Sequence, residues 1–337
     1  MPIPYRQLDI TTLMKNNFVY YDNFVDLRIN NIKIYMKFFV ALLLSSSISG
    51  SLYAQKPDIP IIRVSYALSH VRDTTNRDRP YTENMVLIVG RNASLFTSED
   101  KITQMERMAE FIKKQTEENG GTLTNVVMQK GLIRSVSLTD IYFFSSEKKM
   151  ITIENKATKF RIDEDVSPIS WKISKDTANF SGISCKKATA YFKGRSWTAW
   201  FAPDLPFSSG PWKLNSLPGL IIEAYDDRKD IHFIFTGLQK AENIGAAKKN
   251  EIIQIGNGTA FLDRETYMGS EIKVPTNTVQ TTQIEIDRLN KAMLENPAAL
   301  LNSQSGGTTS LKRISVPSTQ SVVKSKFNNP IERPEKK

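Results

Sequence analysis

Cysteine and histidine are nearly absent from this chain of 337 residues, which contains one cysteine, Cys185, and two histidines, His70 and His232. A lone cysteine cannot form a disulfide within the chain, so the fold has to depend on a packed core. Transition-metal sites usually gather three or four histidine, cysteine or carboxylate ligands, and the two histidines stand in separate predicted strands. The sequence therefore predicts no metal site and no bound cofactor.

Two signatures of common hydrolases are missing as well, because neither Gly-x-Ser-x-Gly nor the zinc-binding His-Glu-x-x-His occurs. The thiol of Cys185 acts as a nucleophile only beside a group that lowers its pKa, and Lys186 and Lys187 follow it directly. A free cysteine on a strand is more commonly a small buried apolar residue. His232 lies close in sequence to the aspartates of 226–230, so a histidine–aspartate pair that catalyses hydrolysis remains an alternative. We predict a protein without enzymatic activity. The alternative is a hydrolase whose active site cannot be identified from the sequence.

The apolar run 38–44 is too short to cross a membrane, which takes about 20 apolar residues. It follows Lys37 and leads through a serine-rich stretch to Ala54, which is the pattern of a secretory signal peptide. We therefore expect 36–54 to be a signal peptide and the mature chain to have no transmembrane span. Residues 1–35 are then not part of the native protein and come from an upstream start. The predicted location is the periplasm, the cell surface or the medium.

The formal net charge of +10 is concentrated near one end of the chain. Residues 303–337 hold seven basic and two acidic side chains, and the part between the predicted signal peptide and this stretch is nearly balanced. Serine, threonine, glycine and lysine dominate from residue 302 onward, a composition that buries too little apolar surface to fold. We predict a disordered basic tail over 301–337. Export and the balanced charge of the rest argue against nucleic acid as a partner.

Apolar and polar residues alternate over 62–69, which indicates a half-buried strand. Helical spacing over 99–118, with acidic residues first and glycines after, predicts one long helix. From residue 140 to 236, short apolar runs are separated by polar or glycine-containing turns, as in successive hairpins. We predict an α+β fold, mainly β, in a single domain over 55–300. It would be one strongly curved antiparallel meander, half-barrel-like, with helix 99–118 on its concave or open side.

A segment without periodicity, 203–219, separates two of these predicted strands. Long connections inside a domain are usually functional or disordered, and this one carries apolar side chains that argue against disorder. We expect it to be an ordered loop that packs back on the sheet. Trp197 and Trp200 fall on opposite faces of the strand before it, so at least one of them needs a cover. That cover is the loop in our preferred interpretation, and a helix or a ligand in the others.

The run Gly-Pro-Trp-Lys-Leu-Asn-Ser-Leu-Pro-Gly-Leu-Ile-Ile over 210–222 resembles the signature of the GLPGLI family of bacterial envelope proteins. Ser216 stands in place of the first glycine of that signature, and 217–221 match it. The resemblance extends over about 61–241 and implies an exported envelope protein, without implying any established activity. Its motif residues in this chain are Gly210, Pro211, Pro218, Gly219, Leu220 and Ile221.

The aromatic and apolar residues of this region predict a binding surface. We expect it to take an apolar or peptide ligand, a lipid, or another envelope protein, in the concavity of the sheet beside the loop. The residues predicted to bind are Trp200, Phe207, Trp212 and Leu217. An interaction module without a pocket is the further alternative.

Overall fold

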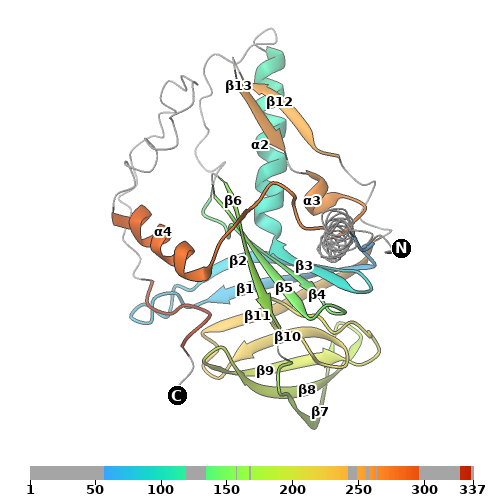
Figure 1. Cartoon of the computed structure of the whole chain (residues 1–337). Coiled ribbons are helices and arrows are strands. Elements are labelled where there is room, and N and C mark those ends of the chain that lie inside the picture. The colour runs from blue at the N-terminus through green and yellow to red at the C-terminus, as the bar shows by residue number, and fades with distance from the viewer. Residues whose placement is uncertain are drawn as a thin grey trace, which may run out of the picture. The chain divides into compact units, whose positions relative to one another are not determined.

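Twelve strands form one mixed sheet that does not close into a barrel (Figure 1). The order across it is β14-β6-β5-β4-β3-β2-β1-β11-β10-β9-β8-β7, and β12 and β13 form a separate pair. The strands are β1 (Ile62–His70), β2 (Tyr81–Val89), β3 (Ala93–Ser98), β4 (Thr139–Phe144), β5 (Lys149–Asn155), β6 (Lys159–Asp165), β7 (Lys172–Phe180), β8 (Ile183–Phe192), β9 (Arg195–Ala202), β10 (Leu220–Asp226), β11 (Ile231–Lys240), β12 (Glu251–Ile255), β13 (Gly258–Leu262) and β14 (Val279–Gln280).

This computed structural model describes residues 57–118, 134–156, 158–166, 168–241, 249–255, 258–262, 264–295 and 327–334. They fall within one unit of the chain, Lys56–Lys337. The predicted signal peptide, residues 1–35 and most of the predicted tail lie outside the described residues. The described helices are α2 (Glu99–Glu118), α3 (Arg264–Met268) and α4 (Gln283–Glu295). Within these ranges, no helix combines the length and apolar character that a membrane crossing would need.

The sheet is mainly antiparallel, but the prediction of a single antiparallel meander is wrong in two respects. Strands β1 to β6 and strands β7 to β11 form two meanders, and these join where β1 pairs with β11. The paired residues are about 160 to 180 positions apart in sequence, as Ile62 and Lys240 are. No local turn pattern could therefore predict this pairing. In addition, β14 runs parallel to β6 at the edge, which makes the sheet mixed.

The sheet bends so that distant strands share one core. In a flat sheet, the six strand spacings between β9 and β4 would span about 29 Å. Trp212 nevertheless lies with its ring centroid 5.5 Å from that of Trp197 in β9. It also lines a narrow gap together with Ile141 of β4. One side chain can reach both strands only if the two ends of the sheet turn toward each other around it.

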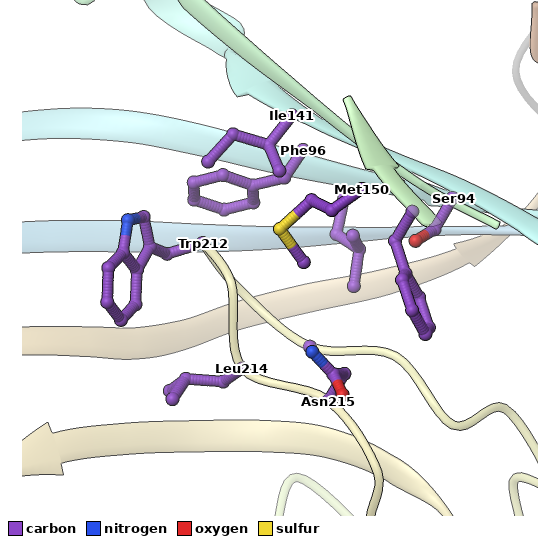
Figure 2. Close-up of a pocket in the computed structure, with 10 residues that line it drawn as sticks. Ser94, Phe96, Ile141, Met150, Trp212, Leu214 and Asn215 are labelled. Carbon is purple, nitrogen blue, oxygen red and sulfur yellow. The ribbon is translucent and has the colours of Figure 1, made fainter. Parts of the chain in front are cut away.

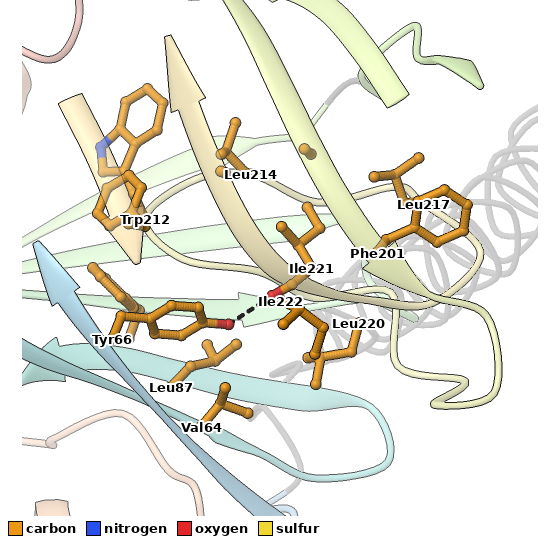
Figure 3. Close-up of a cluster of buried hydrophobic side chains, with 14 of the residues drawn as sticks. Val64, Tyr66, Leu87, Phe201, Trp212, Leu214, Leu217, Leu220, Ile221 and Ile222 are labelled. Carbon is orange, nitrogen blue, oxygen red and sulfur yellow. Dashed lines mark hydrogen bonds between the residues drawn. The ribbon is translucent and has the colours of Figure 1, made fainter. Parts of the chain in front are cut away.

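The larger apolar cluster lies on the face that we call the inner face, the one that carries Val64, Tyr66 and Leu87 (Figure 3). The loop 203–219 packs into it through buried Trp212, Leu214 and Leu217, as expected for an ordered loop. The hydroxyl of Tyr66 donates a hydrogen bond of 2.7 Å to the carbonyl oxygen of Ile221, which fixes β10 over β1. Burial strongly raises the pKa of Tyr66, so this donor keeps its proton.

A second apolar cluster covers the opposite, outer face of β2 to β5. It contains Val86, Ile88, Leu95 and Tyr142 together with Ile102 from the start of helix α2. Alternation along β2 buries side chains on both faces of that strand, so each face needs its own cover. Helix 99–118, which was expected on the concave or open side of the sheet, therefore does not cover the concave inner face. The loop takes the inner face, and the first turn of α2 packs on the outer face.

The segment 327–334 departs from the predicted disordered tail. It lies against the sheet with Asn329 fully buried, and the backbone N–H of Asn328 donates to the carbonyl oxygen of Arg72 at 3.0 Å. The composition of the tail predicted disorder because apolar residues are few. Here polar contacts with charged side chains position the segment instead. Residues 301–326 and 335–337 lie outside the described residues.

Candidate ligand-binding cavity

A cavity of about 800 Å³ opens on the inner face beside the loop. Its apolar floor comes from strands of both meanders, and Trp212 and Lys213 of the loop form one wall. Segment 327–334 and helix α4 contribute to the remaining walls. The apolar side chains that face the cavity are Leu68, Met85, Phe96, Ile141 and Phe233.

The loop itself is packed tightly onto β3 to β5. Figure 2 shows Phe96, Ile141 and Met150 on the sheet side and Trp212 and Leu214 on the loop side. The space left between them is only about 10 Å³, close to the smallest volume that holds one water molecule. The concavity under the loop is therefore filled by the protein's own side chains, and the room for a ligand lies next to Trp212.

Two polar atoms of the cavity wall stand out among the described residues, because they are buried and have no hydrogen-bond partner. They are the hydroxyl oxygen of Thr152 in β5 and Nε of Arg72. Thr152 has only 4% of its surface exposed. The guanidinium carbon of Arg72 lies 3.2 Å from the ring centroid of Tyr81, so the charge is partly balanced by the ring face.

Glu83 is a buried carboxylate at the same wall, and its hydrogen bonds are satisfied within the chain. It accepts from the hydroxyl of Ser98 at 2.5 Å, the hydroxyl of Tyr81 at 2.8 Å and the backbone N–H of Ser137 at 2.7 Å. Burial raises the pKa of Tyr81, and the neighbouring Glu83 carboxylate raises it further. The phenol of Tyr81 therefore keeps its proton and donates it in the hydrogen bond to Glu83.

An ion-pair network lies at the rim, where the loop meets segment 327–334. The ammonium of Lys213, a side chain only 5% exposed, lies 2.5 Å from Glu164 and 2.6 Å from Glu332. Lys193 lies 3.4 Å from Glu164 and 3.5 Å from Glu332. Burial alone would raise the pKa of Glu164, but the two ammonium groups outweigh it and hold the pKa below its ordinary value. The neighbouring carboxylates likewise raise the pKa of Lys193, so Glu164 and Lys193 are both charged.

Of the predicted binding residues, Trp212 lines the cavity and the other three lie elsewhere. Leu217 is 1% exposed in the main cluster, where it packs beside Phe201 (Figure 3). Phe207 is half-buried against the same cluster. Trp200 lies on the outer face, 6.0 Å from the ring of Phe180. The structure thus brings the loop to a cavity but does not collect these four side chains at one site.

The motif residues act as structural parts of the loop. Leu220 and Ile221 are fully buried. A Cβ on Gly219 would lie 2.2 Å from the carbonyl oxygen of Ala202, so only glycine allows this approach. Ser216, at the position of the missing glycine, has φ +71° in the left-handed region. The GLPGLI-like run therefore specifies a tight crossing onto β10, in which Ser216 adopts a backbone conformation that favours glycine.

The alternative catalytic residues are not arranged as a hydrolytic site. Burial raises the pKa of Cys185 to about 11, and the charge of Glu223 adds to the effect. The thiol therefore stays protonated and is a poor nucleophile. His232 pairs with Glu223, Nε2 to Oε1 at 3.0 Å, and not with an aspartate of the preceding turn 226–230, which was the pair considered for the alternative hydrolase. Because Phe233 faces the cavity, alternation directs His232 to the outer face.

Two aspartates of the turn, Asp226 and Asp230, instead accept hydrogen bonds from arginines. Asp226 accepts from the buried guanidinium of Arg195 at 2.5 Å, and Asp230 accepts from Arg77. Arg195, Thr152 and Asn329 were not predicted from the sequence. No local pattern marks them, since the partners of Arg195 in segment 327–334 lie 134 to 136 positions away.

The chain from β4 to β10 contains the loop, both lysines of the rim network and the strands that hold the loop. Residues 142–223 match the model of the family named Porph_ging, described as a protein of unknown function. The Porph_ging match includes Trp212, Thr152 and Arg195, while β1, β11 and segment 327–334, which complete the cavity, lie outside it.

No curated protein matches the chain. Two solved structures, both of PNGF-II in different space groups, are similar to it at 10% and 11% sequence identity, each with a TM-score of 0.41. The similarity covers 68% of this chain but only 33% and 32% of theirs, so the chain spans about a third of their length. A likeness of this size carries no argument about function. Among the described residues, histidine, cysteine and carboxylate side chains form no group of three that could hold a metal ion.

Proposed function

We propose that the chain is a non-enzymatic binding protein of the GLPGLI type, exported to the cell envelope or surface, with an apolar or peptide ligand in the cavity beside Trp212. The observation that carries the proposal is the cavity of about 800 Å³ on the inner face. Pockets that enclose small ligands usually measure about 300–1,000 Å³ and have mainly apolar walls with a few polar groups. The Porph_ging match at 142–223 is compatible with the GLPGLI resemblance.

The unpartnered hydroxyl of Thr152 gives the ligand a chemical requirement. A buried polar group without a partner costs about 1–3 kcal/mol, and a ligand that hydrogen-bonds to Thr152 would remove that cost. The floor of Leu68, Met85 and Phe233 favours an apolar body. These features together support a ligand with an apolar part and at least one hydrogen-bonding group, as a lipid or an apolar peptide side chain and its backbone would supply.

The two other candidate functions have less support. A hydrolase would need to use the His232–Glu223 pair, which lies on the face opposite the cavity. An interaction module would use an exposed surface such as the outer face near Trp200, and this would leave the cavity without a role. A binding protein is therefore the function that the cavity supports best.

Native mass spectrometry of the full chain, purified from its own cell envelope, tests the proposal. We expect a bound lipid or peptide, and we expect Met85→Trp, which places a bulky ring on the apolar floor of the cavity, to weaken or abolish its retention. Thr152→Val keeps the shape of the side chain and should weaken retention of the ligand while the protein stays folded. Tyr191→Ser, a change at an exposed side chain of β8, is the matched control and should retain the ligand. A ligand-free wild-type protein, or equal occupancy in Met85→Trp, would contradict the proposal.

A further inference from the structure

Segment 327–334 lies across the inner-face end of the sheet and is held almost entirely by polar contacts. The backbone N–H of Arg333 donates to the carbonyl oxygen of Lys193 at 3.0 Å. The side-chain oxygen of Asn328 accepts from the N–H of Thr74 at 2.9 Å. Phe327 remains 60% exposed, so burial of that ring is not what holds the segment. The segment therefore binds as a peptide ligand does, through its backbone and a few side chains.

Arg195 lies at the centre of the surface that holds segment 327–334, which we call the groove and which also includes His70, Val71 and Asp230. Its guanidinium is fully buried, and it donates to Oδ1 of Asn329 at 2.6 Å, to the carbonyl oxygen of Pro330 at 2.6 Å and to that of Ile331 at 2.8 Å. Its remaining contact is the ion pair with Asp226. A buried arginine needs most of its donors satisfied, and segment 327–334 supplies three acceptors from consecutive residues. The groove is thus shaped to receive an extended backbone.

Asn329 is recognised through both ends of its amide. Its Oδ1 accepts from Arg195, while its Nδ2 donates to the carbonyl oxygen of Val71 at 2.7 Å and to Oδ2 of Asp230 at 3.3 Å. Nε2–H of His70 donates to the backbone carbonyl of Asn329 at 2.8 Å. An aspartate here would place a second carboxylate oxygen against Asp230 and against a carbonyl. The site therefore distinguishes asparagine from its closest isostere by charge and by donor pattern.

The neighbouring residues of the segment add to this recognition. Pro330 restricts the residue before it to extended conformations, which suits the groove. Ile331 packs against the main apolar cluster. A Cβ on Gly194 would lie 2.6 Å from Cβ of Arg333, so the turn between β8 and β9 admits the peptide backbone at close range. Together these contacts describe an extended Asn-Pro-Ile pattern.

We infer that this groove is a peptide-recognition site for an Asn-Pro-Ile segment, and that residues 327–334 of the same chain are the ligand that occupies it in cis. The segment follows helix α4 through 296–326, a stretch of 31 residues in which serine and threonine are frequent. Its partners at the groove lie far away in sequence, up to 259 positions for His70 and Asn329. The inference does not depend on a ligand in the cavity, because the recognition contacts are made at the groove.

The test uses the full chain with a site for a specific protease inserted between Ser303 and Lys326. The protein folds intact, is then cleaved, and is freed of the released fragment by gel filtration. A fluorescent peptide with the sequence of 327–334 is added, and binding is measured by anisotropy. Tethering supplies an effective concentration on the order of 1 mM, so we expect the peptide to bind below that concentration and unlabelled peptide to displace it.

Two peptide variants carry the same chemical change at adjacent positions. Asn329→Asp should bind at least about 10-fold more weakly, the size expected when hydrogen bonds in a charged, buried site are lost. Asn328→Asp keeps the oxygen that accepts from Thr74 and should bind within about 3-fold of the native peptide, since its contacts are exposed. Equal affinity for the two variants, or no binding at about 1 mM, overturns the inference. Loss of the circular dichroism spectrum when the fragment leaves also overturns it, because the segment would then be part of the folded core.

Discussion

The indole ring of Trp212 lies over that of Trp197, with centroids 5.5 Å apart and ring planes at 30°. Trp197 belongs to β9 and is 1% exposed, and its Nε1–H donates to the carbonyl oxygen of Phe192 at 3.1 Å. Trp212 belongs to the crossing loop and has φ +55°, a backbone conformation that residues other than glycine rarely adopt. The ring contact therefore holds the loop in a strained backbone conformation. It also places one indole between the core and the cavity.

Replacement of Trp212 by alanine should lower the free energy of unfolding by about 3–5 kcal/mol, the usual loss when a buried large aromatic side chain is removed. Urea denaturation with linear extrapolation measures it. Trp200→Ala is the matched control, because that indole is half-buried on the outer face and should cost clearly less. Equal losses for the two tryptophans would show that Trp212 does not anchor the loop.

Replacement of Ser216 by glycine should stabilise the protein. Ser216 has φ +71°, and the left-handed conformation costs a non-glycine residue about 1–2 kcal/mol. The serine recovers part of this cost by donating a hydrogen bond from its hydroxyl to Oδ1 of Asn215 at 2.5 Å. We therefore expect a net gain of about 0.5–1 kcal/mol in thermal or urea unfolding. Ser208→Gly, in the same loop but without a positive φ, should be neutral or destabilising.

A comparison of Gly219 with Gly182 distinguishes the cost of a steric clash from the cost of a positive φ. Both have positive φ, +158° and +89°. A Cβ on Gly219 would lie 2.2 Å from a backbone oxygen, whereas a Cβ on Gly182 would have no atom within 4 Å. Gly182→Ala should cost about 1 kcal/mol, and Gly219→Ala should cost at least about 3 kcal/mol, because backbone has to move. If the two variants lose the same free energy of unfolding, Gly219 does not lie as close to Ala202 of β9 as the structure shows.

The predictable part of the fold is the part that depends on neighbours in sequence. Alternation and turn residues predicted most strands, because side-chain period and turn chemistry are local. The pairing of β1 with β11, the parallel edge strand β14 and the face covered by α2 depend on contacts between distant residues, so one sequence without partners could not reveal them.

The candidate site shows the same division. Trp212 could be predicted because an aromatic residue in a long ordered loop is conspicuous. Thr152, in the middle of an ordinary strand, becomes notable only when its hydroxyl is seen without a partner at a cavity wall. Asn329 lies in a stretch whose composition predicts disorder, yet it is fully buried. The composition of a segment shows only how much apolar surface it could bury. It does not show that a buried arginine elsewhere in the chain, Arg195, needs the hydrogen-bond acceptors that this segment supplies.

The stability of the protein should depend on pH through His70, which is buried beside Asn329. Burial lowers the pKa of His70 from 6.5 to about 4, and the charges of Arg72 and Arg195 lower it as well, while Asp230 and the hydrogen bond to Asn329 act in the opposite direction. The folded protein thus holds His70 neutral at a pH where the unfolded chain already binds a proton. Stability contributed by the neutral form is complete above pH 6.5 and is lost as the pH falls from about 6.5 to about 4.

His70→Gln isolates this effect, because glutamine can still donate to the carbonyl oxygen of Asn329 but does not titrate. Between pH 6.5 and 4, the free energy of unfolding should fall more steeply in the wild type, by up to about 1.4 kcal/mol per pH unit and about 3 kcal/mol in total. Above pH 6.5 the two curves should run parallel. Urea unfolding at a series of pH values measures both slopes. Parallel curves below pH 6.5 as well would mean that His70 titrates alike in the folded and the unfolded protein, so that its burial does not lower its pKa.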